Sequence, residues 1–291
     1  MTPTGAPLHS NGWDRNTRKP NVSVPEHACD CAVHVYGKST LDPTRVYEPP
    51  QATFDEVLRV HQTLGIGRCV IVQNTTYVND HTVLYDALAR GQGRYLGIAL
   101  VDEHTSDAEF ERLIAAGVRG ARFNFLAILR MDWNRRRFER VVARIAELGW
   151  ITVVHGTADE LHQRAEMLAK VPTPLIIDHM AHWDLGRPFH GDPAFEFITG
   201  LMKEGRAWIK LSNGDRISRT GPPFEDTVPL AQAYIAANPD RAIWASDWPH
   251  ILYRGTVPND AELIELMFRF APDPATRQKI LVDNPALLFR F

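Results

Sequence analysis

Short apolar runs alternate with amphipathic stretches eight times along this chain of 291 residues, and this alternation restricts its fold more than any other feature. The apolar runs have the length of strands. Several of them, such as the run Cys-Val-Ile-Val that begins at Cys69, are apolar at consecutive positions, which is typical of parallel strands covered on both faces. We expect strands at 28–35, 68–73, 95–101, 120–124, 151–155, 175–179, 207–211 and 242–247.

Amphipathic stretches with the period of a helix follow these runs. Eight strand–helix units in one chain favour a closed barrel over an open sheet. The sequence therefore predicts an α/β fold of the (β/α)8 TIM-barrel type as a single domain over 27–291. Residues 1–26 are rich in Pro, Asn, Thr and charged side chains, which is typical of an irregular N-terminal arm. Helices are expected at 53–64, 80–91, 107–116, 134–148, 158–169, 193–204, 224–237, 260–270 and 273–288.

The composition excludes several classes of partner. The formal net charge is −3 and like charges form no block, which argues against binding to nucleic acid or to a membrane surface. Three cysteines are too few for a disulfide framework. No apolar run approaches the roughly 20 residues of a membrane span, and the first residues lack the apolar core of a signal peptide. We expect a cytoplasmic protein; a homo-oligomer is compatible with the sequence, but no segment identifies an interface.

Four polar residues at the ends of predicted strands carry most of the functional signal. His34, His155, His179 and Asp247 stand near the ends of the first, fifth, sixth and eighth strands. The carboxyl ends of barrel strands meet at one mouth, where active sites of this fold are built. A single histidine in such a place is more often structural, but four converging polar residues indicate an active site. We expect Asp247 to act as a general base and the histidines to polarise a carbonyl group.

A second group of polar residues falls on the same predicted mouth. Arg122 and Asn124 end the fourth strand, Arg216 follows the seventh, and His250 lies beside Asp247. Arginine is suited to binding carboxylates because its guanidinium is planar and permanently charged. We therefore expect Arg122 and Arg216 to bind carboxylates of a small anionic substrate, with Asn124 and His250 nearby. For each arginine, a structural ion pair is the alternative.

Four segments, in this order along the chain, resemble motifs of the amidohydrolase superfamily in its amidohydrolase-2 branch. They are Cys29-Asp-Cys-Ala-Val-His-Val-Tyr-Gly37, Ile177-Asp-His-Met180, Trp244-Ala-Ser-Asp-Trp-Pro-His250 and Asp283-Asn-Pro-Ala-Leu-Leu-Phe289. The segment Gly117-Val-Arg-Gly-Ala-Arg-Phe-Asn-Phe-Leu126 is similar to the 2-pyrone-4,6-dicarboxylate hydrolases and related lactonases within that branch.

The resemblance implies a barrel enzyme that hydrolyses a lactone. It places Arg216 where the lactonase group has an arginine for a substrate carboxylate. Tyr47 and Thr75 fall on matching segments, and the resemblance implies that they bind substrate.

Two departures from the family pattern bear on metal binding. The superfamily opens with Asp-x-His-x-His or His-x-His, whereas Ala32 occupies the position of the first histidine here. His155 stands where the lactonase group carries tyrosine. The lactonase group is metal-independent, and a metal site usually takes three or more protein ligands. We expect no required cofactor; the alternative is one zinc or manganese ion at His34, His155, His179 and Asp247.

The expected function is opening of the ring of a small carboxylated lactone, pyrone-like or muconolactone-like, by water activated at Asp247. One alternative is a metal-dependent decarboxylase of an aromatic or unsaturated acid, which Ala32 argues against. A second is a lactone isomerase acting on a sugar-acid lactone, although the presence of Asp247 favours activation of water. A third is a degenerate barrel that only binds a ligand; Ala32 supports it, but the three histidines and Asp247 oppose it.

Overall fold

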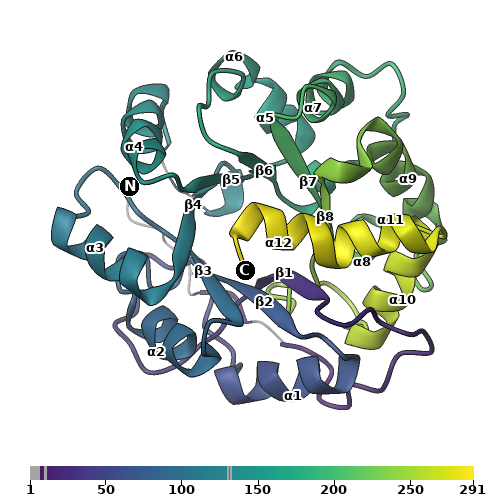
Figure 1. Cartoon of the computed structure of the whole chain (residues 1–291), viewed down its shortest axis with the longest axis horizontal. Coiled ribbons are helices and arrows are strands. Elements are labelled where there is room, and N and C mark those ends of the chain that lie inside the picture. The colour runs from purple at the N-terminus through teal and green to yellow at the C-terminus, as the bar shows by residue number, and fades with distance from the viewer. Residues whose placement is uncertain (1–6, 10–11, 130, 132) are drawn as a thin grey trace.

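Eight parallel strands, hydrogen-bonded in the order in which they occur in the chain, form the central sheet. The computed structural model describes residues 7–9, 12–129, 131 and 133–291. The sheet closes where the Trp248 carbonyl accepts a hydrogen bond of 2.8 Å from the amide of His34. The predicted (β/α)8 barrel is confirmed (Figure 1). The strands are β1 Cys29–Val33, β2 Arg68–Val72, β3 Tyr95–Ala99, β4 Val118–Asn124, β5 Ile151–His155, β6 Leu175–Ile177, β7 Ala207–Leu211 and β8 Ala242–Trp244.

The helices surround the strands as an outer ring (Figure 1). Local sequence explains their ends: Thr53 and Glu56 form a capping box at the start of α1, and Gly65 ends that helix in a left-handed conformation. The ring consists of α1 Phe54–Leu64, α2 Thr82–Gly91, α3 Asp107–Ala116, α4 Arg135–Glu147, α5 Ala158–His162, α6 Ala165–Leu168, α7 Pro193–Lys203, α9 Val228–Ala237 and α10 Asp260–Phe270.

Five predicted strands extend too far, and three of them change how the site is built. The predicted strands at 28–35, 175–179 and 242–247 end in the structure at Val33, Ile177 and Trp244. His179 and Asp247 have φ angles of 54° and 62°, which no strand residue adopts. His34, His179 and Asp247 therefore follow the strands, and the last two lie on left-handed backbone.

Two predicted helices are interrupted. The stretch at 158–169 forms α5 and α6, separated near Arg164. The stretch at 273–288 forms α11 Pro274–Gln278, a π-helical turn Lys279–Asp283 and α12 Asn284–Phe289.

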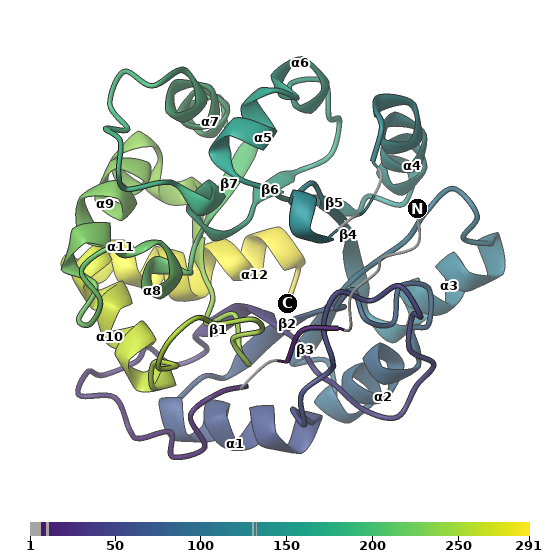
Figure 2. The same cartoon turned by 180° about the vertical axis from the view of Figure 1, so that it is seen from behind.

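The last helix covers one end of the barrel. Helix α12 crosses in front of the strands (yellow in Figure 1), and the view from behind shows the opposite end, where loops follow the strands (Figure 2). Leu288 and Phe289 join the buried cluster inside the barrel, and the Asn284 amide donates to the carbonyl of Ala242 at the start of β8. Because this end is closed by the chain itself, a ligand can reach the barrel only from the other mouth.

The described part of the N-terminal arm packs against that mouth. The ring of Trp13 lies 4.6 Å from the ring of Trp248, and Arg18 forms an ion pair of 2.6 Å with Glu265 of α10. Residues 1–6, 10 and 11 of the predicted arm lie outside the described residues. Among the described residues, no helix is long and apolar enough to cross a membrane.

A pair of glycine variants tests the packing of the barrel. Gly120 lies in β4, and a Cβ atom there would collide with the Ile151 carbonyl oxygen and approach Ile98 Cδ1 to 2.9 Å. We expect Gly120→Ala to lower the free energy of unfolding by about 1–3 kcal/mol, the usual effect of overpacking. Gly200, within α7, has open space around the same position, so Gly200→Ala should raise the free energy of unfolding by about 0.5–1 kcal/mol. Urea denaturation measures both; equal effects would contradict this description of the barrel.

Candidate active site

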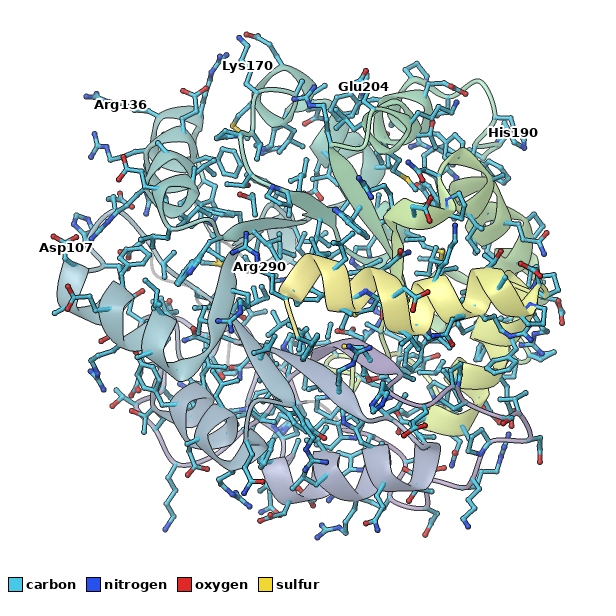
Figure 3. All side chains as sticks on the ribbon, viewed as in Figure 1. Asp107, Arg136, Lys170, His190, Glu204 and Arg290 are labelled. Carbon is cyan, nitrogen blue, oxygen red and sulfur yellow. The ribbon has the colours of Figure 1, made fainter. Side chains whose placement is uncertain are left out.

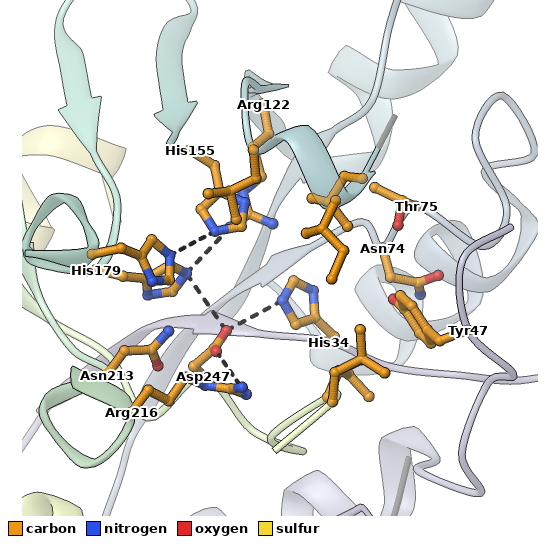
Figure 4. A pocket seen from close by; sticks show the side chains of 16 residues that line it. His34, Tyr47, Asn74, Thr75, Arg122, His155, His179, Asn213, Arg216 and Asp247 are labelled. Atoms are coloured by element: carbon orange, nitrogen blue, oxygen red, sulfur yellow. Dashed lines mark hydrogen bonds and ion pairs between the residues drawn. The ribbon is translucent and has the colours of Figure 1, made fainter. Parts of the chain in front are cut away.

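A cavity of about 190 Å³ opens at the carboxyl ends of the strands. Polar side chains line one part of it and aliphatic side chains another (Figure 4). The cavity brings together most residues that the sequence predicts for the site: Asp247, His34, His155, His179, Arg122, Arg216, Tyr47 and Thr75. Its other lining residues are Asn74, His182, Asn213, Leu126, Ile128, Leu129, Ile251 and Leu252.

Asp247 lies among the basic groups of the cavity. Its Oδ1 atom is 3.4 Å from His34 Nε2 and 3.7 Å from His179 Nε2, and its Oδ2 atom is 3.5 Å from an Arg216 nitrogen (Figure 4). Burial acts to raise the pKa of this carboxyl, but His179, His34 and Arg216 outweigh burial and hold the pKa well below its ordinary value. Asp247 is therefore an ionised carboxylate at neutral pH, as a general base must be.

Arg122 is held by a buried carboxylate that also binds a lysine. Asp178 accepts hydrogen bonds of 2.8 Å from Arg122 Nε and 2.6 Å from Lys210 Nζ. Burial acts to raise the pKa of Asp178, but the two cations hold the pKa below its usual range. Two positive charges thus share one negative charge, and the remaining positive charge lies at the floor of the cavity, where it attracts an anionic substrate. Arg122 therefore forms the structural ion pair that was the alternative prediction, and it also lines the cavity.

The hydrogen bonds of the histidines define which ring nitrogens carry hydrogen. An Arg122 nitrogen lies 3.2 Å from His179 Nε2, and since arginine can only donate, this Nε2 accepts. The hydrogen of neutral His179 is then on Nδ1, which lies 2.8 Å from Ser212 Oγ. In the same way, His155 Nδ1 donates to the amide oxygen of Asn124 at 2.8 Å. Both neutral rings therefore direct an Nε2 lone pair toward the cavity.

A turn of left-handed backbone brings a fourth histidine into the cavity. His179, Met180, Ala181 and His182 have φ angles of 54°, 49°, 54° and 42°. Left-handed backbone costs roughly 1–2 kcal/mol for each such residue, and it persists mainly at functional sites. Residues three apart in a 3₁₀-type turn lie on the same side, which places His182 Nε2 2.9 Å from His155 Nε2.

His182 is not among the site residues predicted from the sequence. The spacing His-x-x-His directly after a strand was the available signal.

Three histidines of the cavity are held neutral. Burial is the largest cause: it lowers the pKa of His155 and His179 well below the ordinary value, and Arg122 lowers both further. The pKa of His182 is lowered to about 4 by burial and by Arg216. At neutral pH the positive charge on this part of the cavity lining, formed by the three histidines and the arginines beside them, therefore comes from Arg122 and Arg216.

Two predicted substrate-binding residues lie behind the lining. Asn124 is fully buried and contacts His155. His250 is bonded through Nε2 to Asp260 at 3.0 Å, and its amide donates to the carbonyl of Asp247. Burial acts to lower the pKa of His250, but Asp260 and Asp215 raise it. Both residues support groups of the cavity from behind.

A metal ion could be held by three imidazoles. His155, His179 and His182 each offer one ring nitrogen, and these three atoms lie within 4.8 Å of one another. This set includes His182 and omits His34 and Asp247, which the sequence suggested as ligands. In the described structure the inward lone pairs already accept hydrogen bonds, since Arg122 donates to His179 and His182 donates to His155. No orphaned lone pair among these described atoms calls for a cation, although the donor set itself fits zinc.

The fold and this site define an amidohydrolase-type barrel enzyme. The family model described as amidohydrolase matches residues 29–291, so the chain belongs to this family. A 4-sulfomuconolactone hydrolase of Hydrogenophaga intermedia is 35% identical over 274 residues, covering 91% of this chain and 89% of that protein. A 2-pyrone-4,6-dicarboxylate hydrolase of Comamonas testosteroni is 32% identical over 288 residues, covering 95% and 94%. A crystal structure from Agrobacterium tumefaciens has a TM-score of 0.84 at 27% identity and covers 94% of this chain and 98% of its own.

The neutral histidines predict a particular loss of stability in acid. An unfolded histidine has a pKa of about 6.5, whereas the folded pKa values of His155, His179 and His182 are lower. As the pH falls below 6.5, the unfolded chain binds protons that the folded chain does not, so the free energy of unfolding falls. For His182 this fall continues to about pH 4, its folded pKa. Carboxylates such as Asp178 lose their contribution only at still lower pH.

Urea denaturation between pH 7 and 4.5 measures this effect. We expect His182→Gln to reduce the pH dependence of the free energy of unfolding, and His190→Gln, a change on the exposed surface, to leave it unaltered. A wild-type stability that does not change between these pH values would contradict the neutral state of the cluster.

Proposed function

We propose that this protein hydrolyses a small carboxylated lactone and requires no metal ion for turnover. The observation that carries the proposal is the ionised Asp247, which lies at the cavity between His34, His179 and Arg216. The relatives named as lactone hydrolases support the substrate class. Five aliphatic side chains offer an apolar face for a flat ring: Leu126, Ile128, Leu129, Ile251 and Leu252.

In the proposed reaction Asp247 removes a proton from a water molecule as that water attacks the lactone carbonyl carbon. The tetrahedral oxyanion receives hydrogen bonds from the guanidinium of Arg122. The ring C–O bond then breaks, and the leaving oxygen takes the proton from Asp247. The product is the ring-opened acid, and the carboxylate is restored.

The tautomers refine the roles expected from the sequence. Neutral His155 and His179 present lone pairs rather than N–H groups to the cavity, so they cannot donate to a carbonyl oxygen. The proposal therefore gives the polarising role to Arg122, whose guanidinium is fixed by Asp178 before substrate arrives. His179 then serves to orient Arg122, and His155 packs against the His179 ring.

Arg216 couples substrate binding to the strength of the base. Its side chain is 19% exposed and reaches both the cavity and Asp247. A substrate carboxylate that pairs with Arg216 offsets the charge that holds down the pKa of Asp247. Binding of the anionic group would thus make Asp247 a stronger base at the moment when it is needed.

A divalent ion at His155, His179 and His182, if bound, would polarise a carbonyl and acidify water. The proposal does not require it, because Arg122 already places a permanent positive charge 3.2 Å from His179 Nε2, and a metal cation there would be repelled.

A panel of mono- and dicarboxylated lactones, followed by loss of ring absorbance, tests the function. We expect ring opening that survives chelation and incorporates one oxygen from labelled water, as hydrolysis requires and isomerisation does not. Asp247→Asn should lower kcat by at least about a thousandfold while the circular dichroism spectrum stays unchanged, because the amide cannot accept the proton. Ring opening that is lost on chelation and restored by zinc would contradict the metal-free part of the proposal, whereas release of CO₂ without ring opening would favour the metal-dependent decarboxylase.

Replacing Arg216 tests how the anionic group is bound. Arg216→Met keeps the length and the apolar stem but removes the charge. We expect KM for a carboxylated lactone to rise roughly 10–100-fold, the usual scale for a lost charge-assisted hydrogen bond. A neutral lactone of the same ring should be far less affected in KM. Equal losses for the two substrates would disprove the carboxylate role.

A further inference from the structure

His182 lines the cavity, yet the proposed reaction leaves it without a role. It comes from the left-handed turn that also carries His179, so one strained segment delivers two imidazoles to the same wall. The His182 ring centroid lies 5.0 Å from that of His155 and 5.3 Å from that of His179. The three rings thus pack against one another around the floor of the cavity.

The direction of the hydrogen bond between His155 and His182 follows from the neighbours of His155. Asn124 donates its amide N–H to Met131 Sδ, which turns its amide oxygen toward His155 Nδ1. Neutral His155 therefore has its hydrogen on Nδ1 and a lone pair on Nε2. The contact of 2.9 Å between the two Nε2 atoms then requires His182 to be the donor.

We infer that His182 is a positioning residue, which holds His155 in this tautomer and keeps the His155–His179 pair in place beside Arg122. His155 has hydrogen bonds at both ring nitrogens, to Asn124 and to His182, and so has no freedom to turn. Its ring meets that of His179 edge to face, with centroids 5.2 Å apart. His179 in turn receives the hydrogen bond from Arg122.

Without the donor on His182, the lone pair of His155 is left unpaired. His155 then keeps only its hydrogen bond to Asn124, so its ring and the His179 ring against it lose their fixed orientation beside Arg122. The charged and titratable groups that act on His155 and His182 are Arg122, Asp178, His179, Arg216 and Asp247. The role of His182 rests on the proposed lactone hydrolysis, although its contact with His155 can be observed without substrate.

Two substitutions of His182 distinguish the hydrogen bond that it donates to His155 from the space that its side chain fills. His182→Leu removes the donor, whereas the side-chain amide of His182→Gln can place an N–H near the position of Nε2. His190→Leu is the control, since His190 lies exposed at the edge of the molecule (Figure 3). Thermal melts first establish that each variant is folded.

We expect His182→Leu to lower kcat roughly tenfold or more with little change in KM, because Arg122 loses its fixed position while the groups that bind the substrate remain. His182→Gln should stay within about threefold of wild type, as should the control. A folded His182→Leu protein with the kcat of wild type would overturn the inference. So would a His182→Gln protein that is impaired as strongly as His182→Leu.

NMR of the imidazole nitrogens separates this inference from the proposed function. In the wild-type protein without substrate, His155 should show hydrogen on Nδ1 and none on Nε2 at neutral pH. In His182→Leu the Nε2 resonance of His155 should shift, because its lone pair no longer accepts a hydrogen bond from His182. Identical His155 spectra in both proteins would overturn the inference whatever the enzyme hydrolyses, whereas a wild type that opens no lactone would overturn only the proposed function.

Discussion

Hydrogen bonds between the first strand of the barrel and the segment that follows the last strand hold the candidate site together. The amide of His34 donates to the carbonyl of Trp248, and the amide of Asp247 donates to the carbonyl of Ala32. Asp30, which is fully buried, accepts from the amide and hydroxyl of Ser246 beside them. A closed barrel has no free sheet edge, so these bonds complete the fold. The same bonds place a proposed general base from the end of the sequence beside a histidine from its beginning.

Buried charge is the second constraint. Asp178 and Lys210 are each only 1% exposed, and a buried pair of this kind stabilises a protein little compared with apolar residues of equal size. Its effect here is to position Arg122. Asp178 accepts a hydrogen bond from Arg122 Nε, while a second guanidinium nitrogen donates to His179. Burying these charges costs free energy, and the result is that the permanent positive charge of Arg122 is held at a fixed place in the cavity.

The barrel and most of the site could be predicted because both follow from short-range pattern. Apolar runs identified the strands, and polar residues that ended those runs, such as His155 and Asp247, identified the mouth. Lys210 gave a signal that was not used: a lysine within the apolar strand Ala207–Leu211 needs a buried carboxylate. The His-x-x-His spacing was the one signal for His182, and it was weak because the entry of His182 into the cavity depends on left-handed backbone that no local propensity favours. The partner of His250, Asp260, lies on a helix whose packing is set by the whole barrel.

Left-handed backbone gathers at the mouth. Non-glycine residues with positive φ include His179–His182, Asp247 and His250, all in segments that follow strands and support or line the cavity. Each is held by bonds from neighbouring elements: Ser212 holds His179, Ala32 holds Asp247 and Asp260 holds His250. Local strain of this kind persists only where the surroundings over-determine it. The regular barrel therefore supplies the rigidity, and the strained turns use it to aim several polar groups into one small cavity.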